Sequence, residues 1–308
     1  MGGSGGGYFS GGDPAKVRQQ LQAASDQTTG AEYSAACNDY LTSLLARFNG
    51  RNVEATHRHL EEITKALEKE LEGSIELSFG GSLAKHTYVD GLSDVDALVM
   101  LDNCELADTT PDVAREYLAA QLRERFMSAA VDKGTLGVTV SFDDIEIQLL
   151  PAVSCKHAVK ISDSTGKQWS EISPQDFTRV LSRQNEAAGK KLVPTVKLAK
   201  AIIAELPQQQ QISGYHAESL AIEVFKGFAG PFTHRDMLRH YFSEGAKRLL
   251  TPIADRTGQS VHVDDALGAP ESLERKIVSD AFARIARRMA NADTASRAED
   301  WKMFFGDT

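Results

Sequence analysis

The stretch that decides the fold is GGSLAKHTYVDGLSDVDALVML, residues 80–101. Asp94 and Asp96 are separated by one residue and are followed by the apolar run ALVML, which is typical of a buried strand. Alternate residues of a strand project to the same face, so the two carboxylates lie side by side. Such a pair is repulsive unless a cation binds between them. The pattern therefore predicts a divalent metal site on a strand.

Gly80-Gly81-Ser82 ends an alternating stretch at residues 74–79 that predicts another strand. Glycine lets a backbone approach a triphosphate closely, and a serine hydroxyl can donate a hydrogen bond to it. Mg²⁺ is a hard ion that binds carboxylates together with substrate phosphates. A strand, Gly-Ser, about a dozen residues and Asp-x-Asp on a strand together indicate a phosphate and metal site more specifically than either motif does alone.

A third carboxylate is expected on a neighbouring strand, since two-metal catalysis needs a ligand for the second ion and a base near the attacking hydroxyl. The best candidate is Glu146 in the segment IEIQLLP at 145–151, and Asp144 is the reserve. An acid flanked by isoleucines belongs either to a solvated strand face or to a metal site. The choice between Glu146 and Asp144 stays open at this point.

Around these strands the sequence predicts an α+β protein with a mixed sheet, followed by an all-helical half. The predicted helices are at residues 14–24, 31–48, 53–71, 111–130, 174 onward, 194–206, 215–228, 234–250 and 273–285, and the predicted strands at 74–79, 95–101, 136–142 and 145–150. Almost everything beyond Pro151 is expected to be helical. The expected organisation is a flexible glycine-rich tail at 1–12, N-terminal helices and core at 13–165, and a helical lobe at 166–308.

Composition limits the class of protein. The 308 residues carry 43 acidic and 34 basic side chains, a formal charge of −9, and 42% are hydrophobic, which excludes disordered and fibrous classes. No apolar run approaches the length of a membrane span and no signal peptide opens the chain, so we expect a cytoplasmic protein that needs no membrane. Three scattered cysteines predict reduced thiols. The acidic balance disfavours binding of long nucleic acid but permits small nucleotides.

The elements Gly80-Gly81-Ser82, Asp94-Val95-Asp96 and Glu146 resemble those of the DNA polymerase beta nucleotidyltransferase superfamily. Further segments are similar to the bacterial CD-NTases, relatives of cyclic GMP-AMP synthase and oligoadenylate synthetase that make second messengers. These segments are KHTYVDGLSDVD at 85–96, LLPA at 149–152, PTVKLAKAI at 194–202, SGYH at 213–216 and WKMFFG at 301–306. The similarity extends, with interruptions, from about Asp13 to Phe305.

The resemblance implies a polymerase-beta-like nucleotidyltransferase core with the active site in the cleft between it and the helical lobe. It implies that Asp94, Asp96 and Glu146 hold two Mg²⁺ ions, for which Mn²⁺ is a substitute. Glu146 would also help to activate the attacking ribose hydroxyl. The same resemblance implies the substrate contacts: Gly81 and Ser82 with the donor triphosphate, Lys200 with the triphosphate, Ser213 with a phosphate, and Tyr215 stacked on a nucleobase.

Two lysines are further candidates for phosphate contacts. Lys197 is one helical turn from Lys200 but also fits the solvated face of an amphipathic helix. Lys85 either binds phosphate or faces solvent. Two positions depart from the family pattern: Gln148 occupies the place where many relatives carry the third acid, and Gly214 replaces the second serine of the motif.

The activity implied by the resemblance is Mg²⁺-dependent synthesis of a cyclic di- or trinucleotide from NTPs, with ATP and GTP favoured, in anti-phage defence of the CBASS type. Activating partner proteins encoded nearby are expected from the same likeness. Two alternatives remain open. One is a superfamily transferase that adds nucleotides to RNA or to a small molecule, and the other is a non-catalytic homologue that senses nucleotides.

Overall fold

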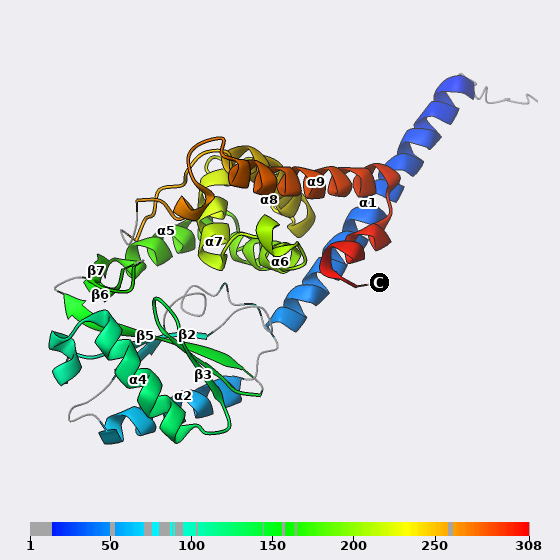
Figure 1. The fold of residues 1–308 in the computed structure, drawn as a ribbon. Coiled ribbons are helices and arrows are strands. Elements are labelled where there is room, and N and C mark those ends of the chain that lie inside the picture. Colours follow the sequence, from blue (N-terminus) through cyan, green and yellow to red (C-terminus); the bar gives the residue numbers. More distant parts are fainter. Residues whose placement is uncertain are drawn as a thin grey trace, which may run out of the picture.

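The structure is a computed structural model that describes residues 14–49, 53–70, 76–79, 87, 89, 95–102, 104–143, 145–155, 158–163, 165–257 and 261–307. A lobe containing the sheet and a lobe of packed helices make up the molecule (Figure 1). The tail predicted at residues 1–12 lies outside the described residues.

The sheet is mixed, as the sequence predicts. Its described strands run in the order β1-β2-β5-β4-β3, and β6 and β7 extend it beyond the second half of β5. β2 pairs with β5 in parallel, and the other pairs are antiparallel. The bounds are β1 Glu76–Phe79, β2 Val95–Met100, β3 Ala130–Lys133, β4 Val138–Ser141, β5 Glu146–Cys155, β6 Ala158–Ser162 and β7 Trp169–Ile172.

One face of this sheet is covered by α2 (Val53–Glu70) and α4 (Pro111–Arg125) (Figure 1). Alternate strand residues point to this face and are fully or almost fully buried: Ala97 and Val99 on β2, Ile147 and Leu149 on β5. The helices bring apolar residues at three- and four-residue spacing to the same core, namely Leu60, Ile63, Leu67, Leu118 and Leu122. The alternating positions 96, 146 and 148 therefore belong to the other face.

The start of α4 follows its sequence signals. Thr110 is the N-cap, its hydroxyl accepts a hydrogen bond from the Val113 amide at 3.4 Å, and Pro111 occupies the first turn. The helix ends at Arg125 rather than near Ala130, because Ala130 begins β3, a strand that the sequence analysis missed. β3 has one buried residue, Val131, and such a strand has no clear alternation to detect.

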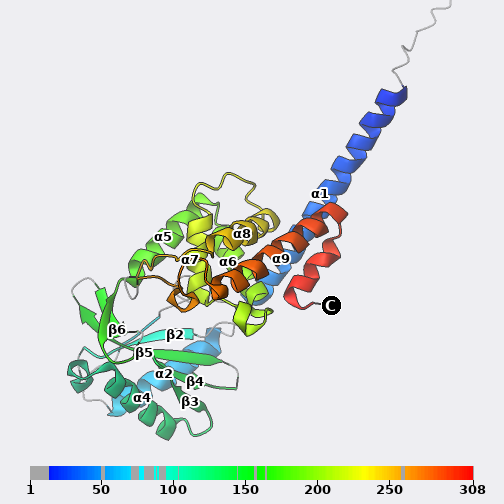
Figure 2. The same ribbon diagram turned by 45° about the horizontal axis from the view of Figure 1, so that its top comes forward.

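The helical lobe has one large apolar core. Its helices are α5 Pro174–Ala187, α6 Leu192–Ala204, α7 Gly214–Val224, α8 His234–Arg248, α9 Leu273–Ala295 and the 3₁₀ segment η4 Ala298–Phe305. α1 (Pro14–Phe48) lies alongside η4 and extends its N-terminal end beyond the rest of the molecule (Figures 1 and 2). Tyr33, Cys37 and Leu41 of α1 are buried in the same core. The first helix therefore packs with the C-terminal half, although the sequence analysis grouped it with the core at 13–165.

Two further expectations about secondary structure are wrong. α1 is one continuous helix where two were predicted, with a break between Ala24 and Ala31. No proline lies in that segment, and extending a formed helix adds a hydrogen bond per residue, which outweighs the modest cost of Gly30. The second error concerns the region beyond Pro151, where β5 continues to Cys155 and β6 and β7 follow. These short strands depend on pairing with their neighbours, which local periodicity does not reveal.

None of the described helices combines the length and apolar character that a membrane span requires.

Candidate active site at the open face of the sheet

The register between β2 and β5 decides which residues meet on the open face. Position 96 pairs directly with Gln148, and Val95 pairs with Ile147. Gln148 and Glu146 are two residues apart on β5, so they share a face. The strand that carries the second aspartate of the Asp-x-Asp motif is thus directly beside the strand that carries the candidate third acid.

Glu146 is exposed at the beginning of β5. The Ser141 hydroxyl on β4 donates a hydrogen bond to Glu146 Oε1 at 2.6 Å, and the two residues are paired in the ladder. One carboxylate oxygen is therefore oriented from the side of β4. Among the other predicted residues of this region, Gly81, Ser82, Lys85, Asp94 and Asp144 lie outside the described residues, as does the side chain of Asp96.

Within the described part of the chain, no group of three histidine, cysteine, aspartate or glutamate side chains is arranged to hold a metal ion. The donors that the sequence brings to this face are carboxylate oxygens and the amide of Gln148, which are the oxygen ligands that Mg²⁺ and Mn²⁺ accept. Glu146 suits this role because its carboxylate is exposed and forms no ion pair with any residue that the structure describes. The donor chemistry therefore fits a divalent ion.

Lys200 lies on α6 and is nine-tenths buried, with a relative exposure of 9%. Its Nζ donates to Glu218 Oε1 at 2.7 Å and to the backbone oxygen of Thr87 at 3.2 Å. Thr87 belongs to the segment between the Gly-Ser and Asp-x-Asp motifs. The structure thus connects the lysine predicted to bind triphosphate with the segment that joins the two motifs of the sheet lobe.

Ser213 and Gly214 begin α7 beside this lysine. Ser213 is the N-cap, and its Oγ accepts a hydrogen bond from the His216 amide at 3.1 Å. A Cβ built at Gly214 would lie 3.4 Å from both Cε and Nζ of Lys200. Gly214, the residue that departs from the family pattern, therefore lies directly beside the Lys200 ammonium group.

Tyr215, in the first turn of α7, is partly buried against the ring of Phe177, with centroids 4.9 Å apart. Its hydroxyl donates to Asp255 Oδ1 at 2.7 Å. Burial, and next the hydrogen bond to the Asp255 carboxylate, raises the pKa of the Tyr215 hydroxyl well above its usual value. The ring is thus held by contacts at both its face and its hydroxyl, and the hydroxyl stays protonated.

Lys197 is engaged differently from Lys200. Its Nζ donates to Asn49 Oδ1, at the end of α1, at 2.5 Å. This contact joins α6 to the residue that follows α1, so Lys197 has a packing role whether or not it also binds phosphate.

Glu218 and Asp255 contact the predicted residues but were not predicted themselves. Glu218 offered one signal, since it is an acid inside the apolar run at 217–222 of a helix that proves to be buried. An acid in such a position is buried only with a partner. Asp255 is in a loop and had no comparable pattern.

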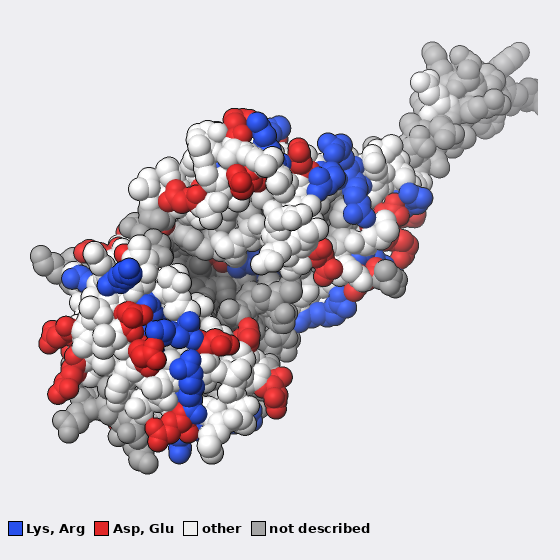
Figure 3. Space-filling view, in the orientation of Figure 1, with Lys and Arg blue, Asp and Glu red and all other residues white. Residues whose placement is uncertain are grey.

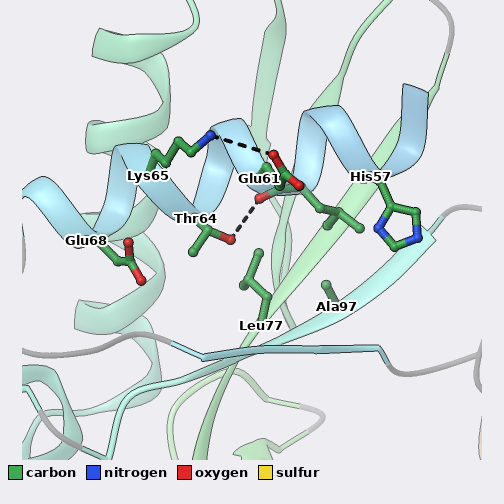
Figure 4. A pocket seen from close by; sticks show the side chains of 8 residues that line it. His57, Glu61, Thr64, Lys65, Glu68, Leu77 and Ala97 are labelled. Carbon is green, nitrogen blue, oxygen red and sulfur yellow. Dashed lines mark hydrogen bonds and ion pairs between the residues drawn. The ribbon is translucent and has the colours of Figure 1, made fainter. Parts of the chain in front are cut away.

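Figure 3 shows a hollow between the sheet lobe and the helical lobe. A separate pocket of about 270 Å³ lies between α2 and strands β1 and β2 (Figure 4). Leu77 and Ala97 form its floor, and Glu61 and Lys65 of α2, 3.6 Å apart, lie at its rim. Because Ala97 points to the face covered by α2, this pocket is on the opposite side of the sheet from positions 96, 146 and 148 and is not part of the candidate site.

Residues 36–185 match the family model of the Second Messenger Oligonucleotide or Dinucleotide Synthetase domain. The chain carries this synthetase domain. The resemblance found in the motifs is thereby confirmed, and the domain assigns the chain to the nucleotidyltransferases. The match covers the whole sheet lobe and ends within α5, so Lys200, Ser213 and Tyr215 lie beyond it.

Solved structures share the fold of the synthetase domain and its helical lobe. E. coli CdnC in complex with HORMA-deltaN is 19% identical, with a TM-score of 0.65 over 86% of this chain and 96% of that chain. Vibrio cholerae DncV, a cyclic AMP-GMP synthase, is 10% identical, with a TM-score of 0.60 over 94% and 90%. Bradyrhizobium diazoefficiens CdnG in complex with GTP is 15% identical, with a TM-score of 0.59 over 89% and 94%. At these identities the likeness establishes the α+β fold with its helical lobe, as predicted. No curated protein matches the chain.

Proposed function

We propose that this nucleotidyltransferase joins ribonucleoside triphosphates, with ATP and GTP favoured, into a cyclic di- or trinucleotide and releases pyrophosphate. One observation carries the proposal. The synthetase domain coincides with the sheet on whose open face positions 96, 146 and 148 meet, and the segment before β2 contacts the helices that carry Lys200 and Tyr215.

We assign Asp94, Asp96 and Glu146 to the binding of two Mg²⁺ ions, which Mn²⁺ can replace. When bound, these ions offset the negative charge of the triphosphate and of the carboxylates. Glu146 in addition accepts the proton of the attacking ribose hydroxyl. The hydrogen bond from Ser141 to Oε1 leaves Oε2 of Glu146 for this task.

The remaining residues bind and orient substrate. Gly81 and Ser82 hold the donor triphosphate, Lys200 adds a positive charge beside it, and Ser213 contributes a phosphate contact at the start of α7. The ring of Tyr215 stacks on a nucleobase, in an orientation that Phe177 and Asp255 fix. In-line phosphoryl transfer needs little covalent assistance, so this positioning and charge compensation account for most of the catalysis.

The test is to incubate the chain with all four NTPs and Mg²⁺, treat the mixture with phosphatase and identify resistant products by mass spectrometry. Asp94→Ala combined with Asp96→Ala is expected to abolish the product. The melting temperature should stay the same or rise, because two mutually repelling carboxylates are removed. Asp132→Ala, on the edge strand β3, is the control and should retain activity. Full synthesis by the double variant would contradict the assigned site.

Gln148 favours a second candidate function, a homologue that binds nucleotides without turnover, because it is the residue paired with position 96. Two substitutions distinguish the candidates. If Glu146 is the third acid, Glu146→Gln abolishes product and Gln148→Glu adds nothing. If the site is degenerate, the wild-type chain binds nucleotide without product, and Gln148→Glu creates activity.

For the biological role we propose second-messenger synthesis in the bacterial cytoplasm as part of CBASS-type anti-phage defence. An activating partner protein encoded nearby is part of this proposal, supported by the HORMA-deltaN complex of the similar E. coli CdnC. No long nucleic acid is required as substrate, in keeping with the net charge of −9.

A further inference from the structure

Three residues form a buried polar cluster between the two lobes, which we call the clasp: Thr87, Lys200 and Glu218. Their relative exposures are 0%, 9% and 1%. Glu218 Oε1 accepts hydrogen bonds from Thr87 Oγ1 at 2.5 Å and from Lys200 Nζ at 2.7 Å. Lys200 Nζ also donates to the Thr87 backbone oxygen at 3.2 Å. Each member of the clasp therefore contacts both others.

The clasp connects two sets of described helices and strands that have few other contacts with each other. Lys200 is on α6 and Glu218 on α7, whereas Thr87 lies between β1 and β2 in the sheet lobe. Among the described helices and strands, those of the sheet lobe pack with one another and those of the helical lobe pack with one another, with little packing between the two sets. The hydrogen bonds of the clasp thus connect Thr87 with α6 and α7.

Burial makes the charge balance of the clasp important. A buried carboxylate without a cation is strongly unfavourable, and Lys200 supplies a cation to Glu218 at 2.7 Å. An ammonium group has three N–H donors, and two of those on Lys200 are used within the clasp. Gly214, whose missing Cβ would lie 3.4 Å from Nζ, borders the ammonium on the side of α7. One N–H of Lys200 is thereby left for an acceptor such as a phosphate oxygen.

We propose that Glu218 is a positioning residue for substrate binding: it holds the Lys200 ammonium group and the Thr87 segment in one fixed arrangement, so that the triphosphate meets an oriented lysine beside the metal-binding strand. This inference rests on the proposed function. Glu218 itself does not touch substrate and acts through Lys200.

The experiment measures the affinity of the full chain for a non-hydrolysable methylene analogue of ATP by calorimetry, which does not require turnover. Glu218→Gln keeps the shape of the side chain but removes its charge, and it should raise the Kd about tenfold. Lys200→Met should raise it by at least as much. The decisive measurement is the Kd of the double variant, Glu218→Gln with Lys200→Met. This Kd should equal that of Lys200→Met alone, because Glu218 acts through the lysine.

Other variants control for folding and charge. Thr87→Val removes only the hydroxyl donor and should raise the Kd about threefold, less than Glu218→Gln does. This variant tests the clasp even if Glu218→Gln does not fold. Glu244→Gln, on the exposed face of α8, makes the same chemical change outside the clasp and should leave the Kd unchanged.

Each outcome supports or overturns the inference. An unchanged Kd in folded Glu218→Gln, or effects of Glu218→Gln and Lys200→Met that simply multiply in the double variant, would overturn it. If the variants show the expected Kd changes but the wild-type chain makes no product, the role of the clasp is supported and the proposed synthesis is refuted. Failure of the wild-type chain to bind the analogue would refute both.

Discussion

The two lobes differ in how deeply they bury ion pairs. The helical lobe has exposed ion pairs, such as Lys247 with Glu244, but it also holds the pair of Arg275 with Asp264 at 2.8 Å, in which both side chains are fully buried. In the sheet lobe, the pairs of Lys133 with Glu116 and Asp112 are at the surface. Arg115 of the sheet lobe is buried, but its ion-pair partner Asp112 is exposed. A fully buried pair makes the stability of the helical lobe depend on both of its charges, whereas a pair with an exposed member loses little when one charge is removed.

The largest expected effect is in the helical lobe. Arg275 donates from its guanidinium to Asp264 and to the backbone oxygens of Leu249 and Gly268. Arg275→Ala should lower the free energy of unfolding by about 3–5 kcal/mol, because it leaves the Asp264 carboxylate buried without its partner. Urea unfolding measures the change. Lys133→Ala is the matched substitution in the sheet lobe and should leave the midpoint unaltered. Equal losses in the two variants would contradict the comparison.

The next effect is a dependence of stability on pH that is specific to the helical lobe. Burial lowers the pKa of His216 to about 4, with Asp264 opposing and Arg275 and Arg248 adding to the shift. Burial, with Lys191, likewise lowers the pKa of His234 to about 4. Both histidines bind a proton in the unfolded chain below about pH 6.5 but stay neutral in the folded chain. Stability is therefore complete above pH 6.5 and falls between pH 6.5 and 4, by up to about 3 kcal/mol for each histidine.

The two tryptophans allow this loss to be located. Trp169 is on β7 of the sheet lobe, and Trp301 is fully buried in η4 of the helical lobe. In Trp169→Phe, the fluorescence of Trp301 should report unfolding that shifts to lower urea as pH falls from 7 to 5. His216→Gln should reduce that shift. A shift of the same size with both histidines replaced would show that other groups cause it.

The smallest expected effect is that of substituting Tyr215, at the boundary between the lobes. Tyr215→Phe removes the hydroxyl that donates to Asp255 and should cost about 1 kcal/mol in unfolding free energy. It keeps the ring against Phe177, so KM for NTPs should change by less than about threefold. Tyr215→Ala removes the ring and should raise KM about tenfold or more. Similar kinetics for the two variants would mean that the ring does not stack on a base.

Much of the fold could be predicted from local patterns. The Thr110-Pro111 start of α4, the spacing of Leu60, Ile63 and Leu67 on α2, and the apolar run that forms β2 each reflect a physical rule within a few residues of chain. β6 and β7 could not be found in this way, because their stability comes from pairing with β5 and with each other. The break predicted in α1 was wrong because polar residues alone do not end a helix.

The candidate site, too, could be predicted only in part from local patterns. Asp94, Asp96 and the Gly-Ser motif were evident from spacing, and the synthetase domain supports the class of enzyme that they indicated. The spacing did not show that Gln148, rather than Glu146, is paired with position 96, since strand register depends on the whole sheet. Whether Glu146 serves as the third acid stays a prediction.

By itself, the sequence determined the elements and the types of chemistry that they carry, because helix periodicity, strand alternation, caps and motif spacing involve neighbours in the chain. The tertiary structure decided which of these residues meet. Thr87 and Glu218, 131 positions apart, share a buried hydrogen bond, and Tyr33 of α1 donates to Asp293 across 260 positions. Such contacts form only when folding brings distant apolar surfaces together and excludes water from the polar groups between them, and no local pattern encodes that partner choice.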